Sequence, residues 1–243
     1  MIIYKGPSRI DGAPIVVIAT GLAKASANAK TGALVQTWIL REDVSPLDAV
    51  NSGADVSICG DCPHRGAIVD GRNVDRSCYV TVFQAPQNVW KTYKRGGYPE
   101  LSRGKILAAF SGKKVRLGAY GDPAAVPFKV WQTLLRWAGP STGYTHRWRE
   151  CAPSLKHYCM ASCDNARDHE EAKAMGWRTF RVRSAHEALA PREIACPASK
   201  EAGQKTTCSA CLACGGTNAK ARVDIAIVAH GSAGKVNAFE RRA

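Results

Sequence analysis

The stretch KVRLGAYGDP at residues 114–123 is followed by VPFKVWQTLLRWAG at 126–139 and TGYTHRW at 142–148. The first and third runs have the composition of β-strands. The apolar residues of the middle run recur at the spacing of one helix face: Val126, Val130, Leu134 and Trp137. A strand, a helix and a further strand in this order form a unit whose two strands are parallel.

The same alternation continues on both sides of this unit. Towards the C-terminus, three further strands and one helix are predicted: HYCMASC (157–163), ARDHEEAKAMGW (166–177, a helix with Gly176 at its C-cap), RTFRVRS (178–184) and VDIAIVAHG (223–231). Towards the N-terminus, the predictions are a strand pair with a long connection, a third strand and a helix: APIVVIAT (13–20), ALVQTWILRED (33–43), SCYVTVF (77–83) and APQNVWKTYKRGGYP (85–99).

Repeated strand and helix units predict an α/β fold. Six to eight such strands in 243 residues suit a TIM-like (β/α) barrel, complete or incomplete, and an open doubly wound sheet is the alternative. We expect one catalytic domain over residues 1–243, with a cysteine-rich loop at 56–78 and a metal-binding segment at 196–230. The chain has no GxGxxG or GxxxxGK[ST] motif, which counts against an ordinary dinucleotide or ATP site.

The charge of the chain points to a polyanionic partner. Lys and Arg minus Asp and Glu is 34 − 20 = +14, with a pI near 9.5. Each phosphate that a protein neutralises releases counterions, so an excess of this size favours nucleic acid. No run approaches the roughly 18 apolar residues of a membrane helix, and the N-terminus lacks a secretory signal pattern. We therefore expect a cytoplasmic protein with nucleic acid as its partner and no membrane association.

Ten cysteines in a chain without a secretion signal favour metal ligation over disulfides. Near the C-terminus, two Cys-x-x-Cys steps share a residue, and one more cysteine precedes them: Cys196, Cys208, Cys211 and Cys214. Either Cys196 or His230 is the fourth ligand of the expected ion. Structural zinc is the first choice, and an iron–sulfur cluster is the alternative.

A second cysteine group lies in the segment CGDCPHRG at 59–66. Cys59 and Cys62 form another Cys-x-x-Cys step, and Cys78 follows. Three thiolates with one further ligand would form a second metal site, although Cys78 also suits an apolar strand. The remaining cysteines, Cys151, Cys159 and Cys163, are expected to be small core residues.

Two aspartates follow predicted strands, where the chemistry of a β/α barrel is located. Asp122 and Asp164 are therefore candidate nucleophile and general acid/base. The alternative is structural: Asp122 makes a turn before Pro123, and Asp164 caps the helix that starts near Ala166.

Basic and aromatic residues alternate in two segments, VWKTYKRGGYP (89–99) and YTHRWRE (144–150). Lys91, Lys94 and Arg95 are expected to bind phosphates, and Tyr93, Tyr98 or Trp148 to stack on an extruded base. The predicted substrate-binding residues are His146, Arg147, Arg65 and Tyr93. The alternative is a helix face with an aromatic core stripe.

Over residues 50–232 the landmarks CGDCPHRG…SCYV, VRLGAYGDP, YTHRW and CPASKEAGQKTTCSACLAC…VAHG occur in order. In this order they resemble bacteriophage 7-deazaguanine DNA transglycosylases, distant relatives of tRNA-guanine transglycosylase. The tRNA enzymes have Cys-x-Cys-x-x-Cys with a histidine and are longer, whereas this chain has Cys-x-x-Cys-x-x-Cys with a preceding cysteine.

The resemblance implies a TIM-like barrel with one structural Zn²⁺ and an enzyme that exchanges guanine in DNA for a 7-deazaguanine such as preQ0. One aspartate would attack C1′ and a second would manage protons, and Asp122 and Asp164 are the positions available. A phage-encoded protein would act in the host cytoplasm. Two other functions stay open: a zinc protein that binds nucleic acid without catalysis, and an iron–sulfur enzyme on a barrel scaffold.

Overall fold

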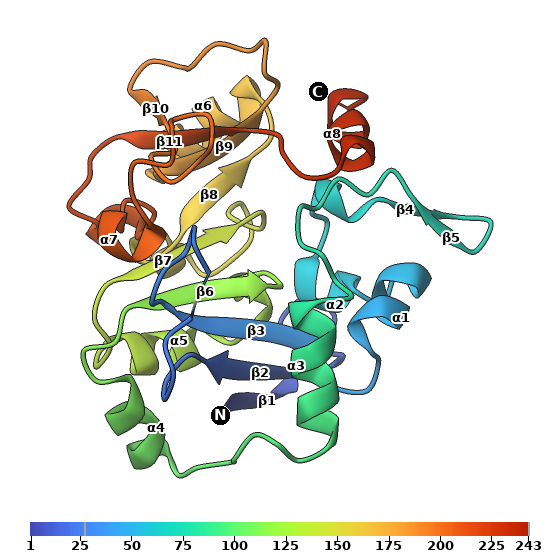
Figure 1. Cartoon of the computed structure of the whole chain (residues 1–243), viewed down its shortest axis with the longest axis vertical. Helices are drawn as coiled ribbons and strands as arrows, with labels where there is room; N and C mark the ends of the chain where they lie inside the picture. The colour runs from blue at the N-terminus through green and yellow to red at the C-terminus, as the bar shows by residue number, and fades with distance from the viewer. Residues whose placement is uncertain (27, 243) are drawn as a thin grey trace.

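A nine-stranded sheet runs through the computed structural model, which describes residues 1–26 and 28–242 (Figure 1). Its strands lie in the order β1-β2-β3-β6-β7-β8-β9-β11-β10. Their bounds are β1 (Ile2–Pro7), β2 (Pro14–Thr20), β3 (Val35–Arg41), β6 (Val115–Tyr120), β7 (Ser141–Thr145), β8 (Met160–Cys163), β9 (Thr179–Arg183), β10 (Glu193–Ala195) and β11 (Asp224–Val228). A separate hairpin of β4 (Ala67–Val69) and β5 (Arg72–Val74) projects at the right of Figure 1.

Helices connect the strands of the parallel part. The α-helices are α1 (Pro46–Ser52), α2 (Val56–Cys59), α3 (Ala85–Lys94), α4 (Arg103–Phe110), α5 (Phe128–Leu135), α6 (Ala166–Ala174), α7 (Cys208–Cys211) and α8 (Ala233–Glu240). Short 3-10 helices are η1 (Pro63–Arg65), η2 (Pro123–Ala125), η3 (Pro153–His157) and η4 (Gly216–Asn218).

The central unit of the sequence folds as predicted. β6 and β7 are parallel, with Val115 opposite Ser141, and α5 connects them. The helix is shorter than its apolar pattern and ends at Leu135. Trp131 is fully buried beneath it, so burial of one helix face fixes α5 on the sheet. Trp137, which the pattern assigned to the same face, lies beyond the helix and is 55% exposed.

The N-terminal strand pair is also confirmed, since β2 and β3 are antiparallel with Ile18 opposite Trp38. The sequence did not predict β1, which extends the sheet along β2. The interior of β2 is buried on both faces, from Ile15 to Ala19. Such a strand reads as a continuous apolar run, because helices and loops cover both sides of the sheet.

Two predictions about the fold need correction. The run SCYVTVF at 77–83 forms no strand, because its backbone contacts η1, with the Cys78 amide donating to the His64 carbonyl at 3.0 Å, and no sheet strand. The α/β class is confirmed, but barrel closure is not, because no pairing joins β1 to β10 within residues 1–26 and 28–242. In the part of the chain that the structure describes, no helix has the length and apolar character needed to cross a bilayer.

Candidate functional site

One cavity of about 210 Å³ lies against a face of the sheet. Several strands contribute every second residue to its lining. From β7 and the residue that follows it, these are Thr142, Tyr144 and His146. Because side chains alternate between the two faces of a strand, this spacing places the cavity on a single face. Most of its lining is apolar, so the charged groups inside it are candidates for binding or catalysis.

The N-terminal cysteine group lines this cavity. Cys59 ends α2, Cys62 precedes η1, and Cys78 belongs to the irregular segment that follows the β4–β5 hairpin. The Cys62 amide donates to the Cys59 carbonyl at 3.4 Å, which closes the tight turn of the Cys-x-x-Cys step. Gly60 has a φ of 63° in this turn, a conformation that favours glycine. Burial, with the neighbouring acidic groups adding to it, raises the pKa of Cys59 well above its usual value.

The C-terminal cysteine group lines the same cavity. Cys208 and Cys211 are one turn apart on α7, Cys214 follows α7, and Cys196 follows β10. Each segment is tied to the sheet or its loops: the Gly143 amide donates to the Cys214 carbonyl at 3.1 Å, and the Cys196 amide to the Ala226 carbonyl at 2.8 Å. Burial raises the pKa of Cys214 to about 12, and the other thiols of the group contribute to the rise.

The spacing of these thiols bears on which metal they suit. Within residues 1–26 and 28–242, the only three or more His, Cys, Asp or Glu ligand atoms within 4.8 Å of one another belong to His64, His146 and Asp164. A zinc tetrahedron with bonds of about 2.3 Å holds its four sulfurs closer together than this limit. An iron–sulfur cluster distributes its cysteines over several iron atoms and takes a wider set. Within the described residues the thiols therefore line one cavity without forming a compact ligand set, and both zinc and an iron–sulfur cluster stay predictions.

His230, the alternative fourth ligand, also lines the cavity. Its ring stacks on Tyr79 with centroids 5.4 Å apart, and Nδ1 lies 3.0 Å from the Val228 carbonyl oxygen. The three cysteines expected in the core are outside the cavity lining. Cys159 and Cys163 are fully buried among apolar residues, and Cys151 is partly buried.

His64, His146 and Asp164 form a polar cluster at the end of the cavity covered by α8. Nε2 of His64 lies 2.7 Å from Oδ1 of Asp164, and Nε2 of His146 lies 3.3 Å from Oδ2. Nδ1 of His64 is 2.6 Å from Oγ of Ser77, and the His64 ring stacks on Phe239 of α8. Asp164 thus lies between the imidazoles of His64 and His146, and the His64 ring also contacts the Ser77 hydroxyl.

Charge pairing dominates the protonation of this cluster. Burial alone would lower the pKa of His146, but the adjacent Cys62 and Asp164 outweigh it and raise the pKa well above 6.5. Burial alone would raise the pKa of Asp164, but His146 and His64 outweigh it and lower the pKa far below its usual value. The structure therefore favours an ionised Asp164 beside a protonated His146.

Asp122 lines the cavity, yet its carboxylate is already occupied. Oδ1 accepts from the Ala124 amide and Oδ2 from the His146 amide, both at 2.8 Å. Burial raises the pKa of this carboxyl group. Asp122 thus caps the turn that begins at Pro123, as the structural alternative expected, and its other oxygen ties this turn to the residue after β7. Asp164 is not the cap of α6, because Asn165 fills that position.

Arg116 places a positive charge inside the cavity. Nη2 of its guanidinium donates to the Tyr79 hydroxyl at 2.7 Å, and within the described residues no carboxylate forms an ion pair with it. Burial lowers the pKa of this group, but nearby phenol and thiol groups outweigh the effect and raise it. Arg116 is half-buried, and a cation in a mainly apolar cavity without a carboxylate partner favours an anionic ligand.

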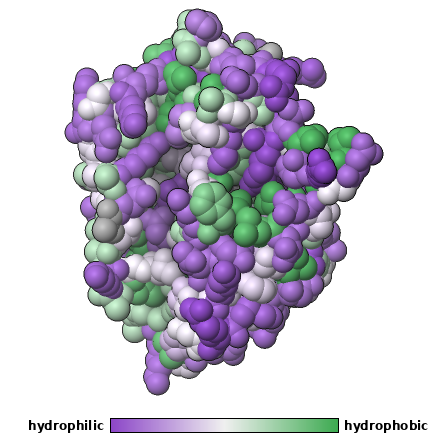
Figure 2. Space-filling view, turned by 45° about the vertical axis from the view of Figure 1, so that its right-hand side comes forward, coloured by the Kyte–Doolittle hydropathy of each residue, from purple (hydrophilic) through white to green (hydrophobic). Residues whose placement is uncertain are grey.

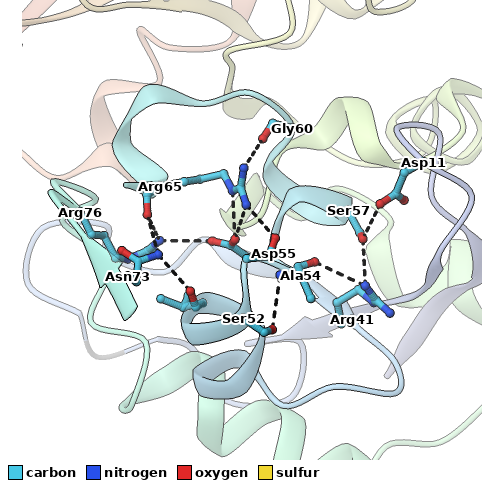
Figure 3. A network of polar contacts seen from close by, with 12 residues as sticks. Asp11, Arg41, Ser52, Ala54, Asp55, Ser57, Gly60, Arg65, Asn73 and Arg76 are labelled. Atoms are coloured by element: carbon cyan, nitrogen blue, oxygen red, sulfur yellow. Dashed lines mark hydrogen bonds and ion pairs between the residues drawn. The ribbon is translucent and has the colours of Figure 1, made fainter. Parts of the chain in front are cut away.

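Three of the four predicted substrate-binding residues are absent from the cavity lining, while His146 is present. Arg65 is bound to the fully buried Asp55, with Nη2 2.6 Å from Oδ1, in the network of Figure 3. The Tyr93 hydroxyl donates to Oε1 of Glu42, which follows β3, at 3.1 Å. Arg147 pairs with Asp61 and Glu150 near the surface. Their local composition was suggestive, but tertiary packing directs each of them to a structural ion pair or hydrogen bond.

The sequence interpretation gave no role to Arg116, Tyr79 or Tyr144, and none to His64 beyond its closeness to Cys62. A signal for Arg116 did exist, because a charged residue in the middle of the apolar strand KVRLGAY must have a partner or a ligand. His64 could not be found this way, since its partner Asp164 is 100 residues away.

No family model, curated protein or solved structure matches this chain. Its function has to be argued from the residues of the cavity.

Proposed function

We propose that this protein is an iron–sulfur enzyme whose substrate binds in the cavity between two cysteine groups. One observation carries the proposal: both groups, separated by more than a hundred residues in the chain, line one cavity. A purely structural metal site would have no reason to face a ligand-sized space. Two such sites at one cavity suggest that the metal centres act on what the cavity holds.

The C-terminal group would supply all four ligands of one cluster: Cys196, Cys208, Cys211 and Cys214. The N-terminal group has three cysteines, so one position of a second cluster would be filled by His146 or left for substrate. When bound, such clusters supply electrons or act as Lewis acids. The two cysteine groups bring seven thiols to one cavity, which supports this choice.

The other polar groups of the cavity have separate roles in this proposal. Arg116 has no carboxylate partner among the described residues, so it would bind an anionic group of the substrate or offset the negative charge of the C-terminal cluster. If the fourth position of the second cluster is left for substrate, His146 donates or accepts a proton beside the N-terminal cysteine group, and Asp164 holds its ring and stabilises its protonated form. His64 and Ser77 extend this contact towards α8.

Anaerobic purification of the full chain tests the proposal. We expect brown protein with iron and acid-labile sulfide in a ratio of about one to one. Cys211→Ser should remove the iron of the C-terminal centre and leave that of the N-terminal one, and Cys62→Ser should do the reverse. Cys151→Ser, a cysteine outside the cavity lining, should keep the full iron content. Colourless protein that binds one zinc ion and no iron, when expressed with both metals, would overturn the proposal.

Base exchange on DNA, with zinc at the C-terminal group, is the second candidate. The observation in its favour is Asp122, a carboxylate that lines the cavity directly after β6, as an incomplete β/α barrel would require. In that reaction Asp122 would have to leave the Ala124 and His146 amides to attack C1′.

Incubation of the zinc-loaded protein with DNA and labelled guanine tests this second candidate, because the exchange requires no other cofactor. Label in the DNA that disappears with Asp122→Asn would support it. Absence of label from both single-stranded and duplex DNA would exclude it. The two candidates therefore differ in metal content and in the need for a reductant.

A further inference from the structure

A second, shallow cavity lies between α4 and α5, outside the cysteine-lined one (α4 is at the lower left of Figure 1). Its volume is about 220 Å³. Three cationic, two neutral polar and one aromatic side chain line it: Arg103, Lys129, Arg136, Gln132, Thr133 and Trp137. Nη2 of Arg103 lies 3.4 Å from Oγ1 of Thr133, which joins the two helices across this groove. We call it the α4–α5 groove.

The charge around the α4–α5 groove is unbalanced. Six exposed cations lie between residues 103 and 136: Arg103, Lys105, Lys113, Lys114, Lys129 and Arg136. The single acidic residue between positions 101 and 149 is Asp122, which is buried at the other cavity. None of the six cations takes part in an ion pair among the residues that the structure describes.

An aromatic side chain stands among these charges. Trp137 is 55% exposed, whereas Trp131, six residues earlier, is fully buried. An exposed large aromatic side chain presents a flat apolar surface to water, on which a planar base can stack. No exposed large apolar side chain other than Trp137 lines the groove, so the surface does not suit an apolar protein partner or the inside of a membrane.

We propose that the α4–α5 groove binds single-stranded nucleic acid. Arg103, Lys129 and Arg136 contact successive phosphates, and Trp137 stacks on an unpaired base. Cations that follow a backbone and an aromatic platform for bases are the two elements of sequence-tolerant single-strand binding. In a duplex the bases stack on one another, so Trp137 could not stack in this way. The groove is independent of the metal centres and serves to hold a polymer on the enzyme.

Fluorescence anisotropy with labelled 12-nucleotide DNA and RNA tests the proposal on the full chain. The groove variant replaces Arg103, Lys129 and Arg136 by glutamine. The matched control replaces Lys91 and Lys94 of α3 and Arg95, which follows it, and these are also three exposed cations. We expect the groove variant to bind about tenfold more weakly at moderate salt and to flatten the log–log salt dependence by about 2, from roughly 0.7 per phosphate contact. The control should change affinity less than about threefold.

Variants of Trp137 distinguish base stacking from simple charge attraction. Trp137→Ala should weaken binding by about tenfold without changing the salt slope, and Trp137→Phe should restore most of the loss. Binding to polyglutamate or to vesicles with anionic lipid should be the same for Trp137→Ala and the unchanged protein.

Three outcomes would overturn the proposal. Equal losses in the groove and α3 variants would mean that only net charge matters. Tighter binding of duplex than of single strands, or no effect of Trp137→Ala, would remove the base-stacking role. Preference for DNA or for RNA would identify which strand is bound, and either is consistent with the proposal. Because the variants are exposed and far from the cysteines in sequence, iron content should stay unchanged, so this test is separate from that of the enzyme.

Discussion

Nε2 of His64 lies 2.7 Å from Oδ1 of Asp164, although the two residues are 100 positions apart. His64 belongs to η1 and Asp164 follows β8, so the contact connects the cysteine-rich loop to the parallel sheet. His146, after β7, approaches the other oxygen of the same carboxylate at 3.3 Å. This cluster fixes one end of the cavity, and its charges lead to a prediction about pH.

Asp164→Asn should destabilise the protein most strongly at mildly acidic pH. The lowered pKa of Asp164 contributes stability that is fully present above the unfolded value of about 3.9 and is lost as the pH falls from there towards the much lower folded pKa. The raised pKa of His146 contributes stability that is full below about 6.5 and is lost at higher pH. The difference in unfolding free energy between the two proteins should therefore peak near about pH 5, at roughly 3 kcal/mol.

Denaturant unfolding across this pH range measures the difference. Asp61→Asn is the control, because Asp61 is exposed and pairs with Arg147 at the surface, where ion pairs contribute about 0–1 kcal/mol. A loss in Asp164→Asn that does not depend on pH would contradict the charge pairing described here.

Asp55→Ala should be among the most destabilising single changes in the N-terminal half. Asp55 has no exposed side-chain surface and binds both Arg65 and Arg76, with Nη2 of Arg65 at 2.6 Å (Figure 3). Removal of one partner from a buried ion pair leaves uncompensated charge and costs roughly 3–5 kcal/mol. Because Arg65 also donates to the Gly60 carbonyl at 3.0 Å, the Cys59–Cys62 turn should loosen as well.

The matched control for Asp55 is Asp43→Ala. Asp43 pairs with Arg41 at the surface, so its loss should cost about 0–1 kcal/mol. The free energy of unfolding and the iron content of the two variants provide the comparison. Equal losses of unfolding free energy in the two variants would show that burial does not make the ion pairs of Asp55 more stabilising than a surface pair.

Gly121→Ala should disturb the strand end that carries Asp122. Gly121 has a φ of 81°, and a Cβ there would lie 2.7 Å from Cβ of Ile39. The left-handed backbone costs roughly 1–2 kcal/mol, and overpacking of the core adds roughly 1–3 kcal/mol. Gly112→Ala, with a φ of 66° and nothing within 4 Å of its new Cβ, should show the first cost alone. Thermal unfolding of both variants measures the difference, and similar losses would contradict the contact with Ile39.

Arg116→Gln should lower the reduction potential of the C-terminal centre if the proposed cluster is present. A nearby positive charge stabilises the more negative, reduced state, so its removal makes reduction harder. Arg116→Lys keeps the charge and should change the potential much less. Potentiometric titration of the visible absorbance follows both variants, and Arg149→Gln, a surface ion-pair partner, is the control. An unchanged potential in Arg116→Gln would mean that Arg116 does not act on that centre.

Apolar residues are unevenly distributed over the surface of the protein. The face in Figure 2 is mainly hydrophilic, with apolar atoms gathered in patches. Exposed apolar residues of the projecting hairpin include Ile68, Val69 and Val74.

The sequence by itself determined the local elements of this protein. The unit from β6 through α5 to β7 and the β2–β3 pair follow from apolar periodicity, because burial of one face requires that spacing within a contiguous segment. The cysteine motifs and the net charge of +14 were also evident without a structure. Local composition was misleading for SCYVTVF, where residues with strand propensity have no neighbouring strand to pair with.

Only the tertiary structure decided what surrounds the cavity. It brought Cys59, Cys62 and Cys78 to the space that the C-terminal cysteines also line, and it turned Arg116 into that space. In the folded protein Arg65 and Tyr93 lie outside the cavity lining, where Arg65 contacts Asp55 and Tyr93 contacts Glu42. These relationships depend on the order in which strands pair across the sheet, and strand order is set by long-range packing that no contiguous stretch of sequence encodes.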